Sequence, residues 1–304
     1  MGKSVGKWNN GGIYLLVLLS LIPLWFSVGH PTGIFSYSVL LLSLLIVFFT
    51  YERYKLIEKS TPFPLLVLCL AAATIPDSFL PLSRSFLLSF LFTAFAFLFL
   101  SAYVKTLRLH FLFNTSFFIM AAVLFSPKCI FLILWPLLTL TFMPSVSFKH
   151  VSAVLLGYIF GALVFSVVSF FHPEGDFLST GISEVFSLRS VNRILSGTSF
   201  YIIRFILLSF LLIISILDVF RRIMRIRITD VHMFKTMVAL LFLSVLTHMF
   251  IQGSALYILF VFSIPLSYFY STFEANLNSP VMRTVFFIVF FIIMASPIVV
   301  KMFY

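Results

Sequence analysis

Long apolar runs follow one another along almost the whole chain, separated by short polar segments. Within each run the apolar residues are continuous rather than alternating, which is typical of membrane helices and not of membrane strands. A helix needs about 20 mostly apolar residues to cross a bilayer. Good candidates for such helices are Ile13–Val28, Ile34–Thr50, Phe86–Tyr103, Val151–Phe171, Phe200–Phe220, Thr236–Ile251, Ala255–Tyr270 and Thr284–Val300.

Further runs are shorter or interrupted, namely Phe63–Leu80, His110–Phe125 and Cys129–Phe142. The last two are separated by "FSPKC", in which Pro127 and Lys128 interrupt the apolar pattern. Residues 110–142 therefore form either two thin spans or a helical hairpin that dips into the bilayer. The pattern predicts an all-α, polytopic transmembrane helix bundle of about 11 spans, with about 10 as the alternative, in a single domain over residues 1–304.

Composition supports a membrane protein. The chain is 62% hydrophobic and 10% charged, and its mean hydropathy is +1.17. A soluble globular protein is about 45–50% apolar and about 25% charged, so this chain lacks the polar residues to cover itself in water. Its core is expected to form by helix packing in lipid, where each backbone N–H and C=O must be paired within the protein.

The basic residues indicate an orientation. If the N-terminus lies in the cytoplasm and each span crosses once, the inner segments carry Lys3, Lys7, Arg53, Lys55, Lys59, Lys105, Arg108, Lys149, Arg221, Arg222, Arg225, Arg227, Lys235 and Arg283. The outer segments carry Arg84, Lys128, Arg189, Arg193 and Lys301. This bias follows the positive-inside rule and predicts a cytoplasmic N-terminus. The net charge of +11 then faces anionic phospholipid on the cytoplasmic side, and no nucleic acid is needed to explain it.

The densest basic cluster is "FRRIMRIR", with Arg221, Arg222, Arg225 and Arg227. We interpret it as a topology anchor that contacts lipid headgroups, with a cytosolic protein partner as the alternative. Asp218 precedes Arg221 and Arg222 at helical spacing, which predicts that its charge is paired at the inner interface.

Gly157 and Gly161 form a G-x-x-x-G pattern in "GYIFG". Two glycines on one helix face allow the backbone of a neighbouring helix to approach closely. In a polytopic chain we expect this neighbour to be internal more often than a second subunit.

The sequence gives little sign of metal, cofactor or transport chemistry. The histidines are scattered without ligand spacing, and no phosphate-binding or nucleotide-binding motif is present, so we expect no metal and no cofactor. Cys69 and Cys129 lie in or beside separate apolar runs and are interpreted as small hydrophobic residues. No predicted span has an acid or a lysine at its centre, which disfavours ion-coupled transport.

The widest polar stretch is "HPEGDFLSTGISEVFSLRSVNR", within an expected outer, periplasmic loop over residues 172–199 that includes a candidate interfacial helix. The candidate catalytic residues are His172, Glu174, Asp176, Arg189, Arg193 and Arg204. Arginines of this kind hold a diphosphate, and an acid or histidine acts as a base, in enzymes of lipid-linked saccharides. The favoured interpretation remains a hydrated loop, because only location brings these residues together.

The run "LFNTSFFIMAAVLFSPKCIFLILWPLLTLTFMPSVSFKHVSAVLLGYIFGALVF", together with "FSIPLSYFYSTF" and "VMRTVFFIVFF", resembles the core and C-terminal end of an uncharacterised inner-membrane family of the Bacteroidota. The resemblance extends from about Phe86 onward and contains no catalytic signature. It implies an integral protein of the bacterial inner (cytoplasmic) membrane, and it implies no reaction.

The leading functional expectation is an accessory protein or complex subunit in cell-envelope biology, with the lipid bilayer and a membrane protein as partners. One alternative is an envelope glycan or lipid-linked saccharide enzyme of the polymerase or ligase type that uses the region 172–204. A second alternative is a transporter or flippase.

Overall fold

The computed structural model describes residues 34–57, 64–68, 84–144, 146–171, 199–222, 228–251, 255–277 and 279–303. The regular elements of this part are helices, as expected for the all-α class. They are α2 (Ile34–Arg53), α4 (Arg84–Thr106), α5 (Leu109–Phe125), the 3₁₀ helix η2 (Pro127–Ile133), α6 (Leu134–Thr141), α7 (Phe148–Phe171), α9 (Ser199–Arg222), α10 (Ile228–Phe250), α11 (Ala255–Asn276) and α12 (Pro280–Phe303).

Helices long and apolar enough to cross a membrane are present in the described part. Three meet both conditions, namely Phe86–Thr106 in α4, Phe148–Val167 in α7 and Ile228–Thr247 in α10. Shorter apolar helices cover Leu109–Phe125, Pro127–Thr141 and Val281–Ile293. The expected span Ile13–Val28 lies outside the described residues, as does most of Phe63–Leu80.

Two helices extend well beyond the apolar runs that predicted them. α10 begins at Ile228 rather than Thr236, and α11 continues past Tyr270 to Asn276. The added turns contain Asp230 and Glu274, each of which forms an ion pair with a neighbouring helix. Because these charges are paired, the helices continue into polar sequence that an apolar pattern alone does not include.

The interruption at Pro127 produces a change of helix type. Ser126 ends α5, and its N–H donates to the Ala122 carbonyl at 3.0 Å. Proline lacks an N–H and cannot continue α5, but it is well suited to the first turn of a new helix, so η2 begins at Pro127 and leads into α6.

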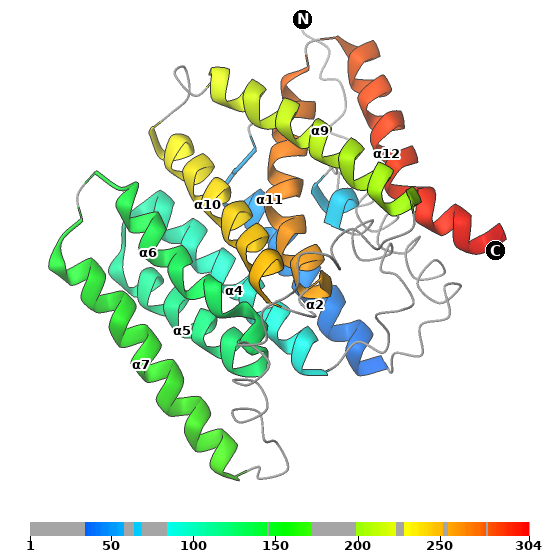
Figure 1. Ribbon diagram of the computed structural model, residues 1–304. Helices are drawn as coiled ribbons and strands as arrows, with labels where there is room; N and C mark the ends of the chain where they lie inside the picture. Colours follow the sequence, from blue (N-terminus) through cyan, green and yellow to red (C-terminus); the bar gives the residue numbers. More distant parts are fainter. Residues whose placement is uncertain are drawn as a thin grey trace, which may run out of the picture.

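The helices pack in a branched order around α4. α4 lies against α2 and α5, and α5 lies between α4 and α7. α10 packs against η2, α6 and α11, and α11 packs against α9. In Figure 1, α7 lies along one edge of the bundle, whereas α9 and α12 lie on the opposite side.

Phenylalanine rings fill the contact between α4 and α5. The ring of Phe118 on α5 stacks on Phe92, Phe95 and Phe99 of α4, with centroids 6.0, 5.2 and 5.5 Å away. These α4 residues recur at helical spacing, so one face of the helix supplies all of them. Each such pair contributes about 0.5–1.5 kcal/mol beyond burial of its area.

Gly157 and Gly161 of α7 face α5. A Cβ added at Gly157 would lie 2.5 Å from the carbonyl oxygen of Phe113 and 2.8 Å from Cβ of Ser116. A Cβ at Gly161 would lie 3.0 Å from Cβ of Met120. The partner of this G-x-x-x-G pattern is thus another helix of the same chain.

We predict that Gly157→Ala destabilises the bundle, because the new methyl group meets a backbone oxygen that cannot rotate away. Overpacking of this kind costs about 1–3 kcal/mol. The measurement is the thermal unfolding temperature of the purified protein in mild detergent. The matched control is Leu155→Ala on the outward face of α7, where the side chain is 51% exposed. Equal unfolding temperatures for the two variants would contradict the close α5–α7 contact.

Candidate functional site

Charged side chains of the described residues gather where α4, α9 and α11 end and where α10 and α12 begin. Ion pairs join Lys105 to Asp230, Arg222 to Asp218 and Arg283 to Glu274. The start of α7 lies at the same level, because the rings of Tyr103 and His150 are 6.1 Å apart. We call this region, defined by the three ion pairs, the polar end.

The first ion pair of the polar end joins α4 to α10. Nζ of Lys105 lies 2.5 Å from Oδ1 of Asp230, and the two side chains are 20% and 25% exposed. The pair links residues far apart in the sequence and sets the end of α4 beside the start of α10. Because both groups keep contact with solvent, they mark a place where water reaches the helix ends.

The second ion pair joins a buried carboxylate to a half-exposed arginine. Nε of Arg283 on α12 lies 2.9 Å from Oε1 of Glu274 on α11, whose side chain is 9% exposed. Arg283 also donates to the Leu277 carbonyl at 3.4 Å. A buried carboxylate is tolerated when a base and hydrogen bonds compensate its charge. Arg283 therefore fixes α12 against the end of α11.

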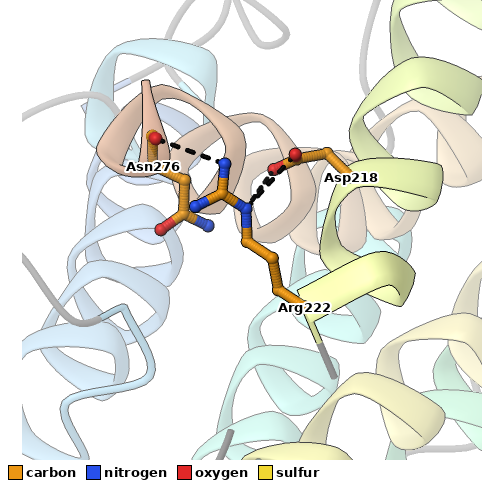
Figure 2. A network of polar contacts seen from close by, with 3 residues as sticks. All are labelled: Asp218, Arg222 and Asn276. Carbon is orange, nitrogen blue, oxygen red and sulfur yellow. Dashed lines mark hydrogen bonds and ion pairs between the residues drawn. The ribbon is translucent and has the colours of Figure 1, made fainter. Parts of the chain in front are cut away.

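The third ion pair lies within α9, where Nε of Arg222 donates to Oδ1 of Asp218 at 3.2 Å (Figure 2). Nη2 of the same arginine donates to the Asn276 carbonyl at 3.4 Å, and this hydrogen bond connects α9 to α11. The predicted pairing of Asp218 within the basic cluster is confirmed, with Arg222 as the partner. Arg221 beside it is exposed.

Further into the bundle, aromatic side chains bind backbone carbonyls of other helices. Tyr158 binds Ile133 at 2.5 Å, and Tyr270 binds Leu208 at 2.7 Å. Trp135 donates from Nε1 to the Thr236 carbonyl at 3.1 Å. Each bond ties two helices together and gives a buried donor its acceptor.

Tyr51, in the last turn of α2, forms another buried bond of this kind. Its hydroxyl donates to the Ile264 carbonyl at 2.6 Å and lies 2.8 Å from the hydroxyl of Ser267, on either side of Pro265 in α11. α2 ends at this level. The N–H of Leu56 donates to the Tyr51 carbonyl at 3.1 Å, and the intervening Lys55 has φ 45°. This left-handed helix ending holds Tyr51 against α11.

The structure leaves the predicted catalytic region untested. His172, Glu174, Asp176, Arg189 and Arg193 lie outside the described residues, as do Arg225 and Arg227 of the basic cluster. Arg204 belongs to the second turn of α9, and its side chain is outside the described part. Convergence of these residues at an outer site therefore stays a prediction.

Some polar groups of the core were not singled out by sequence reasoning. Ser263, Ser267, Ser271 and Glu274 recur at helical spacing along α11, and all are buried. This spacing was visible in "FSIPLSYFYSTFE" as a polar stripe on an apolar helix. The described residues contain no group of His, Cys, Asp and Glu that could hold a metal ion. Cys129 is buried, with its Sγ 3.1 Å from the hydroxyl of Ser89.

We predict that Arg283→Met destabilises the protein, because it removes the arginine that compensates the buried Glu274 charge. The Arg283 side chain is itself 41% exposed, so we expect a cost of about 1–3 kcal/mol, as for a buried acceptor that loses a partner. Unfolding in mild detergent measures the effect. The double variant Arg283→Met/Glu274→Gln is expected to recover much of the loss, since no buried charge remains.

The matched control is Arg222→Met, whose partner Asp218 has a side chain that is 24% exposed. A more exposed pair contributes less, so this loss should be the smaller one. Equal losses at Arg222 and Arg283 would contradict the special role of the buried carboxylate.

The comparisons with known proteins add no relative. No family model matches the chain, and no curated protein or solved structure matches it. The resemblance to an inner-membrane family of the Bacteroidota therefore stays an expectation from the sequence.

Proposed function

We propose that this chain is an integral protein of a bacterial inner membrane that acts as an accessory subunit of a membrane complex in the cell envelope. The observation that carries this proposal is the outward face of α7. Most residues of α7 are left unburied by the described part of the chain: 17% of its apolar stretch is buried, compared with 67% of that of α4.

The outward face of α7 is continuous and apolar. It consists of Leu155, Leu156, Ile159, Leu163 and Val167, whose side chains are 51–60% exposed. The opposite side of α7 is held close to α5 through Gly157 and Gly161. An uncharged helix face held by a rigid neighbour suits a transmembrane helix of a partner, because association in lipid depends on shape and close packing.

We also propose that the chain crosses the membrane about 11 times, with about 10 spans as the alternative. α5 has 17 residues and is about 25 Å long at about 1.5 Å per residue. η2 and α6 together reach about 26 Å, since a 3₁₀ helix rises about 2 Å per residue. Both lengths are close to the hydrocarbon thickness of about 30 Å. These lengths favour two thin spans over a hairpin that turns back within the bilayer.

The proposed orientation places the polar end in the cytoplasm. The described basic residues near this end are Arg53, Lys55, Lys105, Arg108, Lys149, Arg221, Arg222, Lys235 and Arg283. Those toward the other helix ends are Arg84, Lys128, Arg204 and Lys301. The excess agrees with the positive-inside rule and with a cytoplasmic N-terminus. Exposed Phe220 and Ile228 lie beside the arginine cluster, so this surface suits anionic phospholipid headgroups and the adjoining acyl chains.

The test of the accessory role is affinity purification from native membranes in mild detergent, followed by mass spectrometry of proteins and lipids. We expect a stoichiometric membrane protein to copurify with the natural chain. The variant Leu156→Ala/Ile159→Ala/Leu163→Ala should recover at least about tenfold less of this partner. A tenfold loss of affinity corresponds to about 1.4 kcal/mol of binding free energy.

The matched control is Phe242→Ala/Val245→Ala, which truncates exposed apolar residues of α10. This control should keep the partner. Equal recovery with both variants would contradict docking on α7. Copurification of a polyprenyl lipid or glycan, lost in Arg189→Ala and Arg193→Ala, would instead favour the enzyme hypothesis.

The topology is tested separately with reporter fusions. We predict that a reporter active only in the periplasm is active when fused after Asp176 and inactive when fused after Arg227. The reason is that an odd number of crossings separates these positions, through α9. The opposite pattern would reverse the proposed orientation, and the same activity at both positions would exclude a crossing by α9.

A further inference from the structure

Most buried hydroxyl groups of the described bundle bind a carbonyl of their own helix. Those that donate to the carbonyl four residues earlier include Ser43, Thr50, Thr93, Thr115, Ser116, Thr139, Ser215, Thr236, Ser244 and Thr247. This bond is always within reach of a helical serine or threonine, and it removes the penalty of an unpaired hydroxyl in an apolar core.

Ser101 on α4 and Ser271 on α11 depart from this pattern. Both side chains are 0% exposed, and neither hydroxyl has a hydrogen-bond partner among the protein atoms. A buried hydroxyl without a partner costs about 1–3 kcal/mol, so native proteins rarely contain one. Two such groups in one bundle call for a common explanation.

From the register of α4 and α11 we infer that the two hydroxyls lie at a similar depth. Tyr51 fixes the register of the two helices, because its ring lies 5.6 Å from Phe97 of α4 and its hydroxyl lies 2.8 Å from Ser267 of α11. α4 and α11 contact each other and both end at the polar end. One helical turn from Phe97 leads to Ser101, and one turn from Ser267 leads to Ser271.

Polar residues connect this level to the polar end. Lys105 lies one turn beyond Ser101, about 6 Å along the axis, and its pair with Asp230 is partly exposed. On α11, Glu274 lies one turn beyond Ser271 on the same face. The unpartnered hydroxyls thus stand between groups in contact with solvent and the Tyr51–Ser267 contact.

We propose that Ser101 and Ser271 form a buried water-binding site between α4 and α11, supplied from the polar end. Water fits because each hydroxyl can both donate and accept, and because a water molecule in a polar cavity satisfies two to four partners. A bare cation fits poorly. The nearest acids, Asp230 and Glu274, are each already paired with a base, so the site has no excess negative charge.

This site gives the bundle an aqueous inlet and goes beyond the proposed accessory role. Ser267 lies nine residues before the end of α11 at Asn276, which corresponds to about 14 Å along the axis. Water at Ser101 and Ser271 therefore brings solvent hydrogen bonding to within one turn of Ser267, whose hydroxyl contacts Tyr51.

The direction in which alanine substitution shifts the unfolding temperature tests the proposal. If the hydroxyls bind water, Ser101→Ala and Ser271→Ala remove its anchors and lower the unfolding temperature in mild detergent. If the hydroxyls are dry, the same changes remove an unpaired polar group and raise that temperature. The matched controls are Ser43→Ala and Ser244→Ala, whose hydroxyls bind their own helices. The proposal would be overturned if Ser101→Ala and Ser271→Ala lowered the unfolding temperature no more than the two controls do.

A second measurement uses the unsubstituted protein, so it does not depend on a variant that folds. Radiolysis by X-rays converts water into hydroxyl radicals, which oxidise the aromatic rings next to that water. Phe97 and Phe90 of α4 are both 0% exposed. Phe97 lies one turn from Ser101, whereas Phe90 lies about 16 Å from Ser101 along the helix axis. Mass spectrometry should find Phe97 oxidised several times faster than Phe90. Equal rates at the two rings would overturn the proposal.

Discussion

In the proposed membrane location, the absence of water from the hydrocarbon core governs this structure, because each polar group there must find its partner inside the protein. The backbone meets this requirement by forming helices. Serine and threonine meet it by binding the carbonyl one turn earlier, as Ser43 and Thr247 do. Tyrosine and tryptophan cannot reach their own helix in this way, so they bind carbonyls of a neighbour. The aromatic donors thereby become crosslinks, such as the bond from Trp135 to Thr236.

Lipid also changes what holds the helices to one another. Apolar side chains gain little by leaving lipid for protein, so shape and close contact must replace the hydrophobic effect. The α5–α7 contact depends on two glycines that let backbones approach, and the α4–α5 contact depends on stacked phenylalanine rings. α7 is attached through its glycine side, which leaves its opposite face apolar and outward. The proposed partner surface is therefore a direct consequence of how α7 is held.

Charge is restricted by the same rule. The ion pairs of the described residues lie at helix ends, where Lys105, Arg222 and Arg283 join α4 to α10, α9 to α11 and α12 to α11. The polar end is thus both the part of the bundle nearest to solvent and the place where its helices are tied together. A water site one turn inside it would extend this polar network into the core without adding a charge.

The sequence by itself determined the helical class, the apolar character, the glycine face of α7 and the pairing of Asp218 with the basic cluster. All of these depend on residues within one or two helical turns, where spacing alone specifies which side chains meet. Only the tertiary structure decided the true ends of α10 and α11, the pairing of Lys105 with Asp230, and the burial of the Ser101 and Ser271 hydroxyls without a protein partner. They depend on which helices are neighbours and in what register. In lipid that choice arises from close packing and from a few hydrogen bonds between helices, such as those of Tyr51, which leave no periodic pattern in the sequence.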